Sequence, residues 1–180
     1  KRIYLRPLCK EDMNVVTVWI NDPDVHAFLT TKKPMTLESE LDWYEELRKS
    51  NTDMVFVIVL KETDEAIGVM GLHNVDHMNG TATTGSFIGV KECWSRGYGT
   101  EAKMLVLDFA FNTLNLRKVC SSTYDFNIRS QRALEKCGYK VDGVKKQHKY
   151  RKGRYCDEVF FAVFKKDFLP LWRKFKKELA

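Results

Sequence analysis

The segment CWSRGYGTEAKML (residues 93–105) decides how the rest of the chain is interpreted. Gly97 and Gly99 lie between a predicted strand and a predicted amphipathic helix. The first N–H groups of a helix have no partner within it and carry a partial positive charge. Glycines let a phosphate approach these N–H groups, and Arg96 adds a full positive charge. The segment therefore predicts a pyrophosphate site at a helix N-terminus.

The same letters also spell G-x-G-x-x-A, through Gly97, Gly99 and Ala102, which is a dinucleotide-binding fingerprint. In that fold the glycines follow the first strand directly, whereas here residues 91–95 intervene and several strands come earlier. The acidic residue expected about 20 positions further on is missing, since residues 120–122 are Cys-Ser-Ser. The dinucleotide interpretation is disfavoured, and a Walker A loop is excluded because no G-K-[S/T] occurs. A turn without any ligand is the remaining alternative.

The composition is that of a soluble globular protein, with 180 residues, 44% hydrophobic and 30% charged. We expect one domain over residues 1–180, in the cytoplasm, because no transmembrane stretch or signal-peptide core is present. The cysteines show no C-x-x-C spacing, so we expect reduced thiols and no metal site. They are Cys9, Cys93, Cys120, Cys137 and Cys156.

Charge is distributed unevenly around a net value of +6. Acidic residues are in excess over residues 1–53, and basic residues are in excess over residues 54–180. The basic part suits an anionic ligand such as a phosphorylated cofactor, and the acidic part can attract a cation. Nucleic-acid binding is not expected, because no nucleic-acid-binding motif accompanies the charge.

The pattern of apolar residues predicts a mixed α/β (α+β) protein. Strands are predicted at 2–8, 54–60, 66–75, 81–90 and 116–125, with a hairpin at 144–164. Helices are predicted at 10–22, 36–50, after the glycines, at 127–139, and in a tail with Pro170 near its start. The three central strands are joined by turn signals, so they should form an antiparallel meander.

The chain resembles the GNAT N-acetyltransferase superfamily in the segment SRGYGTEA (residues 95–102), which is similar to its R/Q-x-x-G-x-G/A acetyl-CoA signature. Arg96 stands directly before the first glycine, a form common in the branch that contains ribosomal-protein N-terminal acetyltransferases and spermidine N-acetyltransferases. Further similarity to this family lies in four segments: RPLCKEDM (residues 6–13), FNTLNLRKV (111–119), DFNIRSQRALEKCGYKVDG (125–143) and RKGRYCDEVFFAVFKKDF (151–168). The resemblance covers nearly the whole chain.

This resemblance implies a fold in which two neighbouring parallel strands, TGSFIGV and KVCSSTYD, splay apart in a mostly antiparallel sheet flanked by helices. Acetyl-CoA would lie in the opening, with its pantetheine arm along backbone groups around Ile88–Val90. One amide there would polarise the thioester carbonyl. The implied cofactor-binding residues are Ile88, Val90, Arg96, Gly97, Tyr98, Gly99, Thr100, Asn127 and Ser130.

The implied reaction is direct attack of a neutral amine on the thioester in a ternary complex. Spermidine acetyltransferases use a tyrosine as the acid, but the corresponding residue here is Leu134. The ribosomal-protein branch offers the serine of N-x-x-S instead, so Ser130 is the predicted catalytic residue, with a purely structural cap as its alternative. The general base stays open among Asp157, Glu92 and His148.

Acceptor selection in this family comes from the N-terminal helices. The acidic residues there, which would attract an ammonium group, are Asp22, Asp24, Glu38, Glu40, Asp42, Glu45 and Glu46. The leading prediction is an acetyl-CoA-dependent N-acetyltransferase acting on a protein N-terminus. The alternatives are a small-amine acetyltransferase, acting on a polyamine, aminoglycoside or amino sugar, and a non-catalytic acetyl-CoA-binding module. A homodimer is compatible with each.

Overall fold

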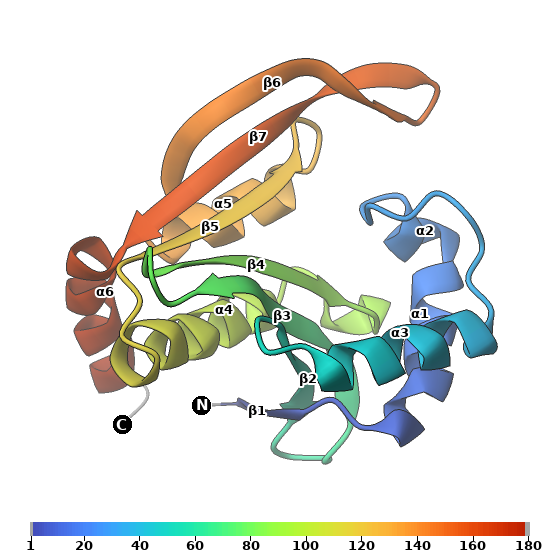
Figure 1. Cartoon of the computed structure of the whole chain (residues 1–180), viewed down its shortest axis with the longest axis horizontal. Coiled ribbons are helices and arrows are strands. Elements are labelled where there is room, and N and C mark those ends of the chain that lie inside the picture. Colours follow the sequence, from blue (N-terminus) through green and yellow to red (C-terminus); the bar gives the residue numbers. More distant parts are fainter. Residues whose placement is uncertain (1, 179–180) are drawn as a thin grey trace.

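The computed structural model describes residues 2–178 and places a twisted sheet between two groups of helices (Figure 1). Its seven strands follow the order β1-β2-β3-β4-β5-β7-β6. They are β1 (Ile3–Pro7), β2 (Met54–Leu60), β3 (Ala66–Asp76), β4 (Thr81–Ile88), β5 (Lys118–Tyr124), β6 (Lys140–Arg151) and β7 (Arg154–Phe164). The helices are α1 (Met13–Asn21), α2 (Pro23–His26), α3 (Leu37–Lys49), α4 (Tyr98–Asp108), α5 (Ile128–Lys136) and α6 (Lys165–Glu178).

All neighbouring strands are antiparallel except β4 and β5, which are parallel. The parallel pair is possible because α4 and its π-helical continuation (Phe109–Thr113) cross from the end of β4 to the start of β5. The predicted antiparallel meander is β2-β3-β4. The predicted mixed, mostly antiparallel sheet with one parallel pair is therefore confirmed.

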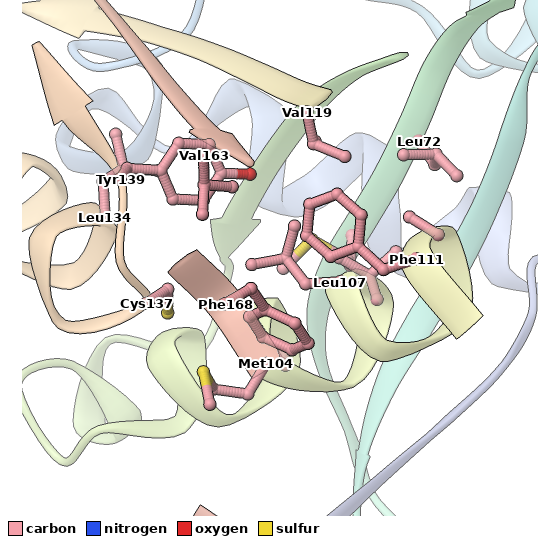
Figure 2. Packing of buried hydrophobic residues seen from close by; sticks show 14 of the residues in the cluster. Leu72, Met104, Leu107, Phe111, Val119, Leu134, Cys137, Tyr139, Val163 and Phe168 are labelled. Carbon is pink, nitrogen blue, oxygen red and sulfur yellow. The ribbon is translucent and has the colours of Figure 1, made fainter. Parts of the chain in front are cut away.

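One face of the sheet is covered by α4 and α6, which form the larger core (Figure 2). Leu107 and Phe111 are fully buried from the α4 side, and Phe168 of α6 packs on Phe111 with ring centroids 5.3 Å apart. Leu72 and Val119 meet them from the strands. Because α4 is buried along its length, its N-terminus is fixed at the end of the sheet where β4 ends.

The opposite face of the sheet is covered by α1 and α3. Met13, Val16 and Trp19 of α1 pack on Val57 and Val69 of the sheet. This smaller cluster holds α1 and α3 against strands β2, β3 and β4, next to the candidate site described below.

Besides shifts of one to three residues at the ends of elements, the structure differs from the predictions in three places. The Asn21-Asp22-Pro23 signal does end α1, but Pro23 then opens the short helix α2, because the Asp22 side chain accepts from the Asp24 N–H at 2.8 Å. Strand β6 begins at Lys140, before the predicted hairpin. The prediction that Pro170 lies near a helix start is wrong, since α6 begins at Lys165 and encloses it.

Within residues 2–178, no helix combines the length and apolar character that crossing a membrane requires.

Candidate functional site

The site begins where β4 and β5 separate. Their parallel pairing covers only Thr81–Thr83 and Lys118–Cys120, although both strands continue beyond it. The apex is closed by the Ser121 hydroxyl, which donates to the Thr84 carbonyl at 2.9 Å, and by the hydroxyl of Tyr139, 2.9 Å from that of Thr84. Burial raises the pKa of Tyr139 far above its ordinary range, so its hydroxyl stays protonated. Beyond this apex the facing edges are open.

The edge of β4 presents backbone groups to this opening. The Gly89 N–H donates to the Ile67 carbonyl of β3 at 2.8 Å, and hydrogen-bonding direction alternates along a strand. The amides of Ile88 and Ser86 therefore face away from β3, toward the opening. The Val90 N–H instead donates to Ile67 at 3.3 Å. Of the two strand residues predicted to contact pantetheine, Ile88 has the free amide.

The start of α4 is the place where the sequence predicts an anion site. Its first helical hydrogen bond runs from the Glu101 N–H to the Gly97 carbonyl at 3.0 Å, so the preceding amides of residues 98–100 make no such bond. Gly97 adopts a left-handed conformation with φ of 85°, which suits glycine. A Cβ on Gly99 would meet only Ile88, at 4.0 Å. These amides are open to an anionic group, and the Arg96 side chain is exposed beside them.

Sequence reasoning missed Arg2, which holds this loop in place. Its backbone N–H donates to the buried Glu101 carboxylate at 2.7 Å, and its guanidinium donates to the Arg96 carbonyl at 2.9 Å. The same guanidinium lies 4.4 Å from the ring centroid of Tyr98. Arg2 therefore holds in place the backbone of the glycine loop, where Gly97 and Gly99 have no side chains to do so.

The start of α5 lies against the same region. The Asn127 side-chain oxygen accepts from the Ser130 N–H at 3.2 Å, which confirms Asn127 as the helix cap. The Ser130 hydroxyl makes no hydrogen bond within residues 2–178 and is half-buried. Arg129 stacks over Trp94 at 4.1 Å, so the first turn of α5 touches the loop before α4. Leu134 is buried in the core.

A cavity of about 340 Å³ lies on the sheet face that α1 and α3 cover. Its floor includes Gly71, Gly85 and His73 of β3 and β4, and its walls include Glu40 and Trp43 of α3. A second hollow of about 550 Å³ is lined only by α1, the residue after it and the start of α3, so it does not reach the sheet. The cavity beside β4 is the one that a second substrate can share with the opening.

Glu40 is the acidic residue that lines this cavity. It is 5% exposed, and burial raises the pKa of its carboxyl group. The carboxylate has no hydrogen-bond or ion-pair partner in the described part of the chain. Its position was visible in the sequence, because Glu40 lies three residues after Leu37 and four before Tyr44, on the apolar stripe of α3.

The other predicted acids do not line this cavity. Asp22 and Asp24 both pair with Lys91, at 2.9 and 3.0 Å, and Glu45 pairs with Arg48. The three candidate bases also lie outside it: Asp157 pairs with Lys146, while Glu92 and His148 are exposed. Sequence reasoning missed His73, although the alternation in Gly71-Leu72-His73 places it on one face with a glycine.

The hairpin of β6 and β7 contacts residues that line the cavity. Arg151, at its tip, donates to the carbonyls of Leu29 and Thr30 at 3.1 and 2.7 Å. Both of these residues line the cavity. The Tyr124 hydroxyl at the end of β5 donates to the same Leu29 carbonyl at 3.1 Å. The rim is thus built from both halves of the chain.

Comparisons with known proteins agree with this geometry. The chain is 28% identical over 172 residues to the uncharacterized N-acetyltransferase p20 of Bacillus licheniformis, covering 93% of this chain and 96% of that protein. It is 24% identical over 168 residues to the spermidine N(1)-acetyltransferase of Escherichia coli, covering 93% and 88%.

The fold is shared with a solved structure of the spermidine N-acetyltransferase of Vibrio cholerae in complex with CoA and spermine. The TM-score is 0.87 at 20% identity, with 93% of this chain and 98% of that chain covered. Residues 2–140 match the acetyltransferase (GNAT) domain family. With its separated parallel strands and its glycine loop at a helix N-terminus, the chain belongs to the GNAT family of acetyl-CoA-dependent N-acetyltransferases.

Proposed function

We propose that the chain transfers the acetyl group of acetyl-CoA to a primary amine of a small, polyamine-like acceptor bound in the 340 Å³ cavity. The observation that carries this proposal is Glu40, a 5% exposed side chain on the cavity wall whose carboxylate has no ion-pair or hydrogen-bond partner among residues 2–178 and so opens to the cavity. Burial of most of this side chain disfavours its charged form, and an ammonium group bound in the cavity would offset that cost. The cavity volume lies within the range of small-molecule sites.

The donor site of this proposal uses the residues predicted from the sequence. The amides at the start of α4 and the Arg96 guanidinium would bind the pyrophosphate, with Asn127 and Ser130 contacting the arm from α5. The free amide of Ile88 or Ser86 would stabilise the oxyanion formed on the thioester carbonyl. Their assignment as cofactor contacts stays a prediction, supported by the open amides at the start of α4 and by a Ser130 hydroxyl that makes no hydrogen bond within residues 2–178.

For the proton that the departing thiolate takes up, Ser130 remains the candidate acid. Its hydroxyl is free and lies one helical turn after the Asn127 cap, at the start of α5. Leu134, where spermidine acetyltransferases carry a tyrosine, is buried and cannot supply a proton. This difference favours a protein N-terminus as the second candidate acceptor, since the ribosomal-protein branch uses the serine.

Calorimetry with acetyl-CoA, followed by a thiol-release assay over an acceptor panel, tests both candidates. The panel contains spermidine, spermine, an aminoglycoside, an amino sugar and a peptide with a free N-terminus. We expect micromolar acetyl-CoA binding and fastest CoA release with the polyamines. Release with the peptide alone would replace our proposal by the second candidate. Binding without release by any amine would favour the non-catalytic acetyl-CoA-binding module.

A further inference from the structure

An imidazole backed by a carboxylate lies on the floor of the cavity. Nδ1 of His73 is 3.0 Å from Oδ1 of Asp53, and the His73 side chain is 33% exposed. The Nε2 atom makes no hydrogen bond within residues 2–178. The pair joins His73 of β3 to Asp53, the residue just before β2, so it lies where these two paired strands meet the α3–β2 connection.

Asp53 is itself held in place by several donors. The Ser50 hydroxyl donates to Oδ2 at 2.7 Å, and the Asn74 N–H donates to Oδ1 at 3.2 Å. Burial alone would raise the pKa of Asp53, but hydrogen bonds from Ser50, Asn74 and His73 lower it. An ionised carboxylate only accepts, so Nδ1 of a neutral His73 carries the proton. The lone pair is then on Nε2.

The space above Gly71 and Gly85 shows where the lone pair on Nε2 lies. The His73 ring leans back along β3 over Gly71, where a Cβ would overlap Nε2. Gly71 is paired with Gly85 of β4, and a Cβ there would be 4.0 Å from Nε2. Gly85 stands two residues after Thr83, the last residue paired with β5. Nε2 therefore lies beside the point where β4 and β5 separate.

We propose that His73 is the general base of this enzyme, taking a proton at Nε2 from the acceptor ammonium, and that Asp53 is its positioning residue. This inference rests on the proposed function, because it needs an amine in the cavity. An alkylammonium cannot attack a thioester until it loses a proton, and an imidazole can take up a proton near neutral pH. An ionised Asp53 stabilises the imidazolium that results.

The proton balance is as follows. The ammonium R–NH₃⁺ gives one proton to Nε2 and becomes R–NH₂, whose lone pair forms the N–C bond to the thioester carbon. The C–S bond breaks, the Ser130 hydroxyl gives its proton to the departing thiolate, and the second proton from nitrogen restores that hydroxyl. The products are the N-acetyl amine and CoA thiol. The His73 imidazolium then releases its proton to water.

Glu40 is the other ionisable residue on the cavity wall, and it has a different part in this arrangement. It projects from α3, whereas His73 lies on the strand that pairs with β4. The elements around His73 contribute Asp53 behind the ring and Glu40 across the cavity, while the β4 residues at the floor are uncharged. Glu40 is therefore suited to bind a second ammonium of the acceptor while His73 deprotonates the reacting one.

Steady-state kinetics of His73→Gln and Asp53→Asn, with the best acceptor found for the wild type, test this inference. For His73→Gln we expect kcat to fall about 100-fold or more, with the acetyl-CoA Kd within twofold of wild type. The loss should shrink to less than about 10-fold for 2,2,2-trifluoroethylamine, which is already neutral at pH 7 and needs no base. Asp53→Asn should lower kcat less and move the acidic limb of kcat/KM to lower pH, because the imidazolium loses its carboxylate.

His77→Gln is the matched control, since His77 is exposed in the turn after β3 and does not line the cavity. It should behave as wild type. A kcat of His73→Gln within threefold of wild type overturns the inference, as does an equal loss with trifluoroethylamine, which would indicate a structural role. If wild-type enzyme acetylates no amine at all, the proposed function fails instead. Unchanged acetyl-CoA binding reports that each variant is folded.

Discussion

The indole N–H of Trp94 donates to the Ile88 carbonyl at 2.8 Å, which joins the loop before α4 to the edge of β4. The guanidinium of Arg129 lies 4.1 Å from the centre of the same ring. Burial lowers the pKa of Arg129 from its ordinary value, but an arginine remains charged. One tryptophan therefore connects β4, the glycine loop and the first turn of α5, which are the three parts of the proposed donor site.

Replacing Trp94 with Phe removes this hydrogen bond and keeps a ring under Arg129. We expect the affinity for acetyl-CoA to fall about 3- to 10-fold, corresponding to one hydrogen bond. Calorimetry measures this change. Trp94→Ala, which also removes the ring, should lose more, and equal affinity in Trp94→Phe and wild type would contradict the linking role.

Replacing Gly99 with Glu should abolish acetyl-CoA binding, because a carboxylate would stand where the pyrophosphate is proposed to bind. Gly99→Ala is the control, since its Cβ meets only Ile88 at ordinary contact distance. The alanine variant should fold and retain part of its affinity. Survival of full affinity in Gly99→Glu would show that the pyrophosphate binds elsewhere.

Replacing Ser130 with Ala separates proton transfer from binding. The helix cap survives, because it is the Ser130 backbone N–H that donates to Asn127. If the hydroxyl protonates the thiolate, kcat should fall about 10- to 100-fold while KM for acetyl-CoA changes little. A rise of KM at constant kcat would make Ser130 a cofactor contact alone.

Replacing Glu40 with Gln should weaken the binding of a diamine acceptor and stabilise the fold. The KM for a diamine should rise about 10-fold, because the carboxylate that attracts its ammonium is lost. The pKa of Glu40 is higher in the folded than in the unfolded chain, so its ionisation destabilises the fold as pH rises through the folded value. At pH 7 the variant should therefore melt at a higher temperature, whereas Glu46→Gln, at an exposed position of the same helix, should change neither quantity.

Replacing Lys103 with Met should stabilise the protein. Lys103 is buried in α4, and burial lowers its pKa from 10.5 to about 8. The unfolded chain binds this proton more tightly, so below pH 8 the charge favours unfolding, and stability recovers between pH 8 and 10.5. Urea unfolding at pH 7 should show a gain of about 1–3 kcal/mol that shrinks as pH approaches 10. A gain independent of pH would assign it to packing alone.

The structural elements of the proposed donor site could be predicted because their determinants are local in sequence. The glycine loop, the helix that follows and the Asn127 cap each occupy a few consecutive residues, and the resemblance ordered them. The His73–Asp53 pair joins residues 20 positions apart, and only the β2–β3 register brings them together. Glu40 could not be distinguished by its charge from the other acidic residues near it in the sequence; only its spacing on the apolar stripe of α3 sets it apart.

The contact between Arg151 and the Leu29–Thr30 carbonyls has a consequence for how such an enzyme diversifies. The rim of the proposed acceptor cavity includes the loop between α2 and α3 and the β6–β7 hairpin. The glycine loop and the starts of α4 and α5 lie between these two segments in the sequence. Insertions or exchanges in the α2–α3 loop and in the β6–β7 hairpin can change acceptor choice while the segment that contains the proposed donor site stays intact. Grafting the hairpin tip and residues 27–35 together from a relative should therefore transfer amine preference more completely than grafting either one alone.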